Sequence, residues 1–218
     1  MKNVPIVPAV IPKSQAEVVE MSSRLSFSHE FHLDLVDGKF VTSVSWPYDP
    51  EGVPMTVKPY LDKYTLEVDL MVAEPLKAAV EWSEAGADML VFHVETISLE
   101  SFRIFSENTA VSVGVSAHGD TPLETLIEYI KEADYIQLMG IYEIGSQGQP
   151  FDEMVIEKIS KLKELFPDKS ITIDGSVNKN TIKRLCDAGA DRFICGSAIV
   201  LQENPERAWH DLGELINE

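Results

Sequence analysis

The sequence predicts an α/β protein folded as one closed (β/α)8 barrel, the TIM barrel. Apolar runs of strand length alternate with amphipathic helical patterns along the 218 residues. These runs are continuously apolar, which is typical of parallel strands that are covered by helices. Eight such runs in a chain of this length favour the closed barrel.

Eight segments are predicted as strands. They are 4–11, 31–36, 64–71, 89–94, 111–115, 135–139, 171–173 and 192–195. Helical patterns between them include 15–25, 76–85, 123–131, 153–165 and 180–188. An open doubly wound sheet is the competing arrangement, but no Gly-x-Gly-x-x-Gly turn follows the first strand. No linker or repeat divides residues 1–218, so we expect a single domain.

The amino-acid composition argues against several kinds of binding partner. A formal charge of −18 argues against nucleic acid and anionic membrane surfaces. The apolar stretches are too short to span a bilayer and the N-terminus lacks signal-peptide features, so we expect a soluble cytoplasmic protein. The two cysteines lie in apolar surroundings, and we expect packed thiols rather than a disulfide or metal pair.

The second predicted strand carries polar groups where apolar ones are expected. Its residues 32–41 read HLDLVDGKFV, and His32 and Asp34 share one face of the strand. Burying both is costly unless each is paired or bound to a metal. In a barrel, polar residues at the carboxyl ends of strands face the active site. The residues expected at the ends of the other strands are Glu67, Asp69, His93, Glu95, Met139, Asp174, Gly196 and Ser197, and most of them can bind a metal or transfer a proton.

Three loops rich in glycine and serine follow the last three predicted strands. They span residues 145–149, 175–178 and 196–198. Barrels commonly bind phosphate on backbone amides after strands seven and eight, and small residues let the backbone approach the ligand. In so acidic a chain, an anionic substrate needs such amides, helix N-termini or a metal.

At these residues the chain resembles the ribulose-phosphate 3-epimerase family, over nearly its whole length. The family's strand-two signature, His-x-Asp-x-Met-Asp-Gly-x-Phe-Val, matches residues 32–41. Five further family motifs match in the same order along the chain. They are residues 70–72 followed by Pro75, residues 86–87 followed by 93–95, Met139 followed by 145–149, residues 174–177, and residues 189–190 followed by 196–198.

The resemblance implies an enzyme that inverts the carbon beside the ketone of a pentulose phosphate through an enediolate. Asp34 and Asp174 match the two acid/base residues, and both match metal ligands together with His32. Asp69 stands where the family has its remaining ligand, a histidine. We therefore expect one divalent ion, Mn, Mg, Zn or Fe, with oxygen-rich ligation favouring Mn2+ or Mg2+. The expected substrate and phosphate contacts are Met71, Met139, Gly145, Gly148, Gly175, Ser176, Gly196 and Ser197.

Other departures from the family pattern surround the sugar. Ala9 replaces a serine, Val36 a methionine, residues 42–43 a Pro-Asn pair, and residues 142–144 lengthen the strand-six loop. Ribulose 5-phosphate is the leading substrate. The alternatives are a hexulose phosphate epimerase, with Tyr142 and Ser43 reshaping the pocket, and a catalytically weak sugar-phosphate-binding homologue.

Two further expectations follow from the resemblance. The related decarboxylases carry an Asp-x-Lys-x-x-Asp motif on strand three, and residues 67–72 contain no lysine. We therefore do not expect decarboxylase activity. Barrels of this family commonly self-associate, so a homo-oligomer is expected.

Overall fold

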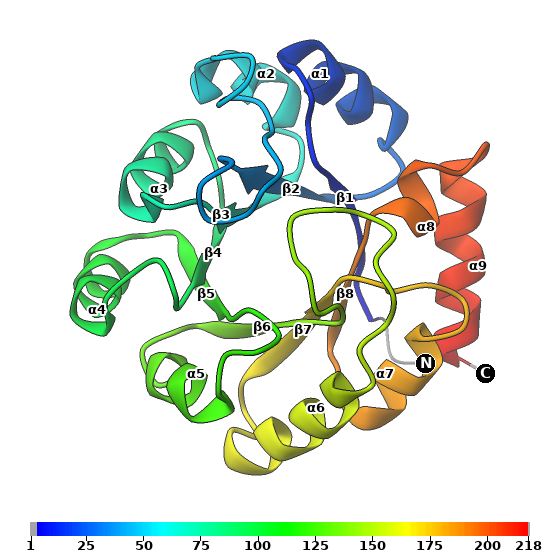
Figure 1. The fold of residues 1–218 in the computed structure, drawn as a ribbon. Helices are drawn as coiled ribbons and strands as arrows, with labels where there is room; N and C mark the ends of the chain where they lie inside the picture. Colours follow the sequence, from blue (N-terminus) through cyan, green and yellow to red (C-terminus); the bar gives the residue numbers. More distant parts are fainter. Residues whose placement is uncertain (1–3, 218) are drawn as a thin grey trace.

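The computed structural model describes residues 4–217, and its strands close into the predicted barrel (Figure 1). All neighbouring strands are parallel, and β1 closes the ring by pairing with β8. The strand ends differ from the predicted runs by at most two residues. The strands are β1 Ile6–Val10, β2 Glu30–Val36, β3 Thr65–Met71, β4 Met89–His93, β5 Ser112–Ser116, β6 Tyr135–Met139, β7 Ser170–Asp174 and β8 Arg192–Cys195.

Helices surround the barrel (Figure 1). They are α1 Gln15–Arg24, α2 Lys58–Leu61, α3 Pro75–Glu84, α4 Leu99–Asn108, α5 Leu123–Ile130, α6 Met154–Leu165, α7 Ile182–Ala188, α8 Ser197–Val200 and α9 Pro205–Asn217, with a 3-10 turn η1 at Pro54–Val57. The five predicted helices appear as α1, α3, α5, α6 and α7. The helix α7 begins later than predicted, because the Asn178 side chain holds a turn by accepting from the Asn180 amide at 2.9 Å.

Local chemistry sets several helix ends. Ser14 caps α1 by accepting a hydrogen bond from the Glu17 amide at 3.1 Å. Pro75 starts α3, where its fixed φ suits the first turn and its missing N–H is not needed. Gly189 ends α7 with a φ of 111°, a left-handed conformation that favours glycine.

The apolar core lies mainly between the strands and the helices, whereas the barrel interior is unusually polar. Branched apolar residues usually fill such interiors. Here Glu67 of β3 contacts Tyr135 of β6 and Arg192 of β8, strands that are not its neighbours in the sheet, so the contacts cross the interior. The barrel interior therefore contains polar side chains that hold one another in place, instead of only packed apolar side chains.

Two expectations drawn from composition concern membranes and cysteines. No helix within residues 4–217 is long and apolar enough to cross a membrane. Both cysteines are free thiols, as predicted, with Cys195 buried and Cys186 half-buried.

Candidate active site

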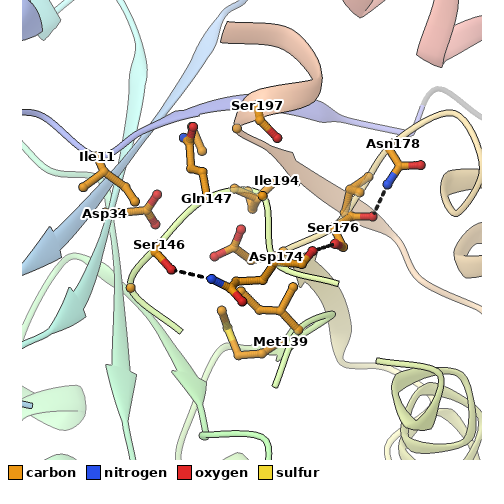
Figure 2. A pocket seen from close by; sticks show the side chains of 18 of the residues that line it. Ile11, Asp34, Met139, Ser146, Gln147, Asp174, Ser176, Asn178, Ile194 and Ser197 are labelled. Carbon is orange, nitrogen blue, oxygen red and sulfur yellow. Dashed lines mark hydrogen bonds between the residues drawn. The ribbon is translucent and has the colours of Figure 1, made fainter. Parts of the chain in front are cut away.

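The carboxyl ends of the strands open into a cavity of about 240 Å³ (Figure 2). Its walls come from six strands and from the loops after β6, β7 and β8. This is the face on which barrels of this fold carry their active sites. Ten of the predicted site residues line it: Asp34, Met71, Met139, Gly145, Gly148, Asp174, Gly175, Ser176, Gly196 and Ser197.

The remaining two predicted residues, His32 and Asp69, are fully buried beside the cavity. One ligand atom from each of His32, Asp34, Asp69 and Asp174 lies within 4.8 Å of those of the other three. Asp34 and Asp69 are register partners on neighbouring strands, and Asp174 joins them from β7. The structure thus brings together the four residues predicted as metal ligands.

Buried neighbours hold the His32 ring on both sides. Its Nδ1 donates to Oε2 of Glu67 at 2.7 Å, and its Nε2 lies 3.1 Å from Oδ1 of Asp34. Burial alone would lower the pKa of His32, but the hydrogen bonds and charges of Asp34 and Glu67 raise it well above its ordinary value. The ring is therefore fixed with Nε2 toward the carboxylate cluster.

Glu67 is itself held by two further interior groups. Arg192 donates from Nη1 to Oε2 of Glu67 at 2.7 Å, and the Tyr135 hydroxyl donates to Oε1 at 2.7 Å. Burial would raise the pKa of Glu67, but the Arg192 charge and the His32 hydrogen bond hold it well below its usual range. Glu67 is therefore an anion that orients His32, an arrangement common behind metal-binding histidines.

Asp69 is oriented by a second buried pair. His93 donates from Nε2 to Oδ1 at 2.9 Å, and Gln137 donates from Nε2 to Oδ2 at 2.7 Å. Each carboxylate oxygen keeps a lone pair beyond the one already used. Asp69 is thus fixed in place while retaining capacity to bind a cation.

The two carboxylates that line the cavity, Asp34 and Asp174, both have raised pKa values. Burial raises the pKa of Asp174 well above its usual value, and the charge of Asp34 adds to the effect. Burial also raises the pKa of Asp34, with His32 opposing and Asp69 adding to the rise. No lysine or arginine lines the cavity within the described part of the chain.

These observations fit a divalent ion. Three carboxylates and one oriented imidazole converge, and their mutual repulsion is what a bound cation relieves. The donor set is oxygen-rich. Among residues 4–217, His32, Asp34, Asp69 and Asp174 are the residues that could hold such an ion.

The loop after β7 is fixed by local hydrogen bonds. Gly175 and Ser176 have successive φ values of 92° and 51°, and a positive φ is uncommon for serine. The Ser176 carbonyl accepts from Asn178 Nδ2 at 2.8 Å and from Thr181 Oγ1 at 2.7 Å. This strained turn is therefore held by its surroundings and lies at the cavity wall, where such strain is commonly functional.

Several polar residues flagged in the sequence lie outside the cavity. Tyr142 and Ser43, invoked for a reshaped sugar pocket, do not line it, and Tyr142 is exposed. Glu95 accepts from the His118 amide at 2.8 Å and belongs to the loops outside the cavity. Tyr142 and Ser43 therefore do not shape this pocket directly, and Glu95, expected at the active-site mouth, does not line the cavity.

Sequence reasoning missed the supporting roles of Tyr135, Gln137 and Arg192. Each lies within a run that was interpreted only as a buried strand. A usable signal was present, because a polar residue two positions before a site residue shares its face of the strand. Gln137 stands in this relation to Met139, as Glu67 does to Asp69.

The fold and this carboxylate cluster define a (β/α)8 barrel with a metal-competent centre at its catalytic face. A profile described as "Ribulose-phosphate 3 epimerase family" matches residues 5–200. The chain belongs to this family. Its members are epimerases, which are isomerases.

Two relatives illustrate the similarity. The ribulose-phosphate 3-epimerase of Methanocaldococcus jannaschii is 34% identical over 196 residues, covering 86% of this chain and 80% of the relative. That of Bacillus subtilis is 31% identical over 186 residues, covering 81% and 82%.

Solved structures share the fold at low identity. The 3-keto-L-gulonate-6-phosphate decarboxylase of Vibrio cholerae has a TM-score of 0.72 at 15% identity, covering 99% of this chain and 98% of the other. The 3-hexulose-6-phosphate synthase of Salmonella typhimurium has a TM-score of 0.71 at 14% identity, covering 98% of each. These likenesses establish the barrel architecture alone.

Proposed function

We propose that this protein is a metal-dependent epimerase that interconverts ribulose 5-phosphate and xylulose 5-phosphate. The observation that carries the proposal is that Asp34 and Asp174 reach one cavity from β2 and β7, which lie three positions apart around the ring. Two carboxylates placed in this way can meet a substrate from different sides. Inversion by two bases requires that placement.

The reaction breaks and remakes one bond. One aspartate takes the proton from the carbon next to the ketone, and the C–H electron pair becomes the carbon–carbon double bond of an enediolate. The other aspartate then donates a proton to the opposite face of the same carbon. The raised pKa values of Asp34 and Asp174 make each a stronger base than an exposed carboxylate, which favours proton abstraction.

His32, Asp34, Asp69 and Asp174 would hold the divalent ion. When bound, the ion stabilises the negative charge that develops on the substrate oxygen. Glu67 fixes the ring of His32, and His93 fixes the carboxylate of Asp69. With three carboxylates among four ligands, we expect Mn2+ or Mg2+ to be preferred over Zn2+.

The loops after β6, β7 and β8 would hold the phosphate. Their glycines, Gly145, Gly148, Gly175 and Gly196, lie at the cavity wall, and small residues there let the loop backbone approach a ligand. Ser176 and Ser197 add hydroxyl groups there. Met71 and Met139 supply apolar surface at the ends of β3 and β6, where the sugar carbons would lie.

Solvent deuterium exchange tests the proposal. The protein is incubated in heavy water with a panel of ketose phosphates, with and without added divalent ions. Metal-stimulated exchange at C3 of ribulose 5-phosphate, with formation of xylulose 5-phosphate, is expected. Exchange only into a hexulose phosphate would move the substrate assignment, and no exchange into any member would leave a sugar-phosphate-binding homologue. A cytoplasmic location and self-association of this chain stay predictions.

A further inference from the structure

The side chain of Gln147 lies in the cavity, against the loop after β8. A Cβ atom added to Gly196 would lie 2.6 Å from Nε2 of Gln147 and 3.1 Å from its Cδ. The carboxamide therefore packs directly over the Gly196 backbone, in the space that a larger residue at 196 would fill. Figure 2 shows it between Asp34 and Ser197.

This amide differs from the other two amides of the cavity. Gln149 donates from Nε2 to Ser146 Oγ at 2.8 Å, and Asn178 donates from Nδ2 to the Ser176 carbonyl at 2.8 Å. Gln147 makes no side-chain hydrogen bond to any residue from 4 to 217, and it is exposed to solvent. Gln149 and Asn178 thus hold the loops together, whereas the Gln147 donors are free to bind a ligand.

The charge distribution of the cavity requires neutral hydrogen-bond donors for an anionic ligand. Its charged lining groups are Asp34 and Asp174, and within the described residues no lysine or arginine lines it. A phosphate dianion that enters this cavity must be held by neutral donors. A side-chain amide offers two N–H groups without a charge of its own.

We propose that Gln147 is a phosphate-binding and specificity-determining residue, whose Nε2 donates to a substrate phosphate bound beside it at the loops after β7 and β8. This inference rests on the proposed function for its substrate, but not for the phosphate contact itself. A hydrogen bond to a charged acceptor contributes more than a neutral one. Loss of the amide therefore costs affinity for phosphorylated ligands and leaves affinity for free sugars unchanged.

The test uses Gln147→Ala and Gln147→Glu, with Gln15→Ala as the matched control. Gln15 is an exposed residue on α1 that does not line the cavity. Binding of inorganic phosphate, ribulose 5-phosphate and free ribulose is measured by calorimetry on the metal-loaded proteins. We expect roughly 10- to 100-fold weaker binding of both phosphate ligands to Gln147→Ala, from the loss of one charge-assisted hydrogen bond. The Gln147→Glu variant should bind them more weakly still, because its carboxylate repels the dianion.

The outcomes separate this inference from the proposed function. Weaker phosphate binding by Gln147→Ala in a protein that does not epimerise ribulose 5-phosphate would support the contact and reject the reaction. Unchanged phosphate affinity would overturn the contact. Tighter binding by Gln147→Ala would also overturn it, and would show that the amide blocks the phosphate site instead of completing it.

Discussion

Replacing Glu67 by glutamine tests how the barrel interior supports the site. Glu67 is fully buried and accepts hydrogen bonds from Arg192, His32 and Tyr135, each at 2.7 Å. A glutamine can turn its oxygen toward Arg192 and His32 and its NH2 toward Tyr135, whose hydroxyl can then accept. The hydrogen bonds survive in this arrangement. The change therefore removes charge rather than shape.

The expected cost follows from what remains around Arg192. Breaking a buried ion pair by removing one partner costs about 3–5 kcal/mol. Arg192 keeps a second pair, from its Nε to Oε2 of Glu30 at 2.9 Å, but Glu30 is partly exposed. We therefore expect the low end, about 3 kcal/mol, which for a chain of this size lowers Tm by roughly 6–12 °C. Metal affinity should fall about 10- to 100-fold, because His32 loses its anionic orienting partner.

Chemical and thermal unfolding of the metal-free protein measure the first effect, and metal titration measures the second. The matched control is Glu30→Gln, the same change at the half-exposed partner of Arg192, with an expected loss of at most about 1 kcal/mol. Adding Arg192→Leu to Glu67→Gln removes the cation that has lost its buried partner and should recover part of the stability but not the metal affinity. Wild-type stability and metal affinity in Glu67→Gln would refute the reasoning.

The pH dependence of this difference has a defined sign. Because Arg192 and His32 hold the pKa of folded Glu67 below its unfolded value, its ionisation stabilises the fold. That contribution is complete above the unfolded pKa of about 4.3 and is lost as the pH falls through the folded pKa. The gap between wild type and Glu67→Gln should therefore shrink in acid. Because Glu67 also raises the pKa of folded His32, the gap should shrink again as the pH rises through that pKa.

Three further sets of substitutions address the catalytic and binding assignments. Asp34→Asn and Asp174→Asn should each lower turnover by roughly 100- to 10,000-fold, and measurement of bound metal separates lost base from lost ligand; near-normal turnover with metal bound would reject the two-base assignment. Gly196→Val should displace the flexible Gln147 amide and weaken phosphate binding without unfolding the chain; equal affinity of the wild type for phosphorylated and free sugar would argue against the site. Asp69→His should move metal preference toward Zn2+ or Fe2+ after loading from a mixture of ions, whereas an unchanged preference would remove Asp69 from the metal shell.

The barrel could be predicted because eight apolar runs of strand length alternate with amphipathic helical patterns along the chain. The same topology predicted where the site lies, since parallel strands present their carboxyl ends on one face. Asp34 and Asp174, 140 positions apart in the sequence, could therefore be placed in one cavity from the strand order alone. What topology does not specify is which interior side chains meet across the barrel.

The contacts of Glu67 show why. Arg192 and Tyr135 come from strands far from β3 in the sequence, and strand tilt and stagger decide which residues share a level of the interior. The position of the Gln147 amide depends on the conformation of a loop, which residue types constrain only weakly. In both cases the residues are visible in the sequence, but their partners are set by three-dimensional register.

The charge distribution links these supports to substrate binding. The interior beside the carboxylates holds the cationic Arg192 and a His32 whose pKa is raised, whereas the cavity itself offers a phosphate dianion two carboxylates and no cationic side chain in the described chain. Repulsion between that dianion and Asp34 or Asp174 falls when a divalent cation occupies their cluster. Binding of the cation and of the substrate must then favour each other by the same factor, because coupling free energies are reciprocal. A site built in this way gains affinity for a sugar phosphate only when it is also ready to stabilise the enediolate.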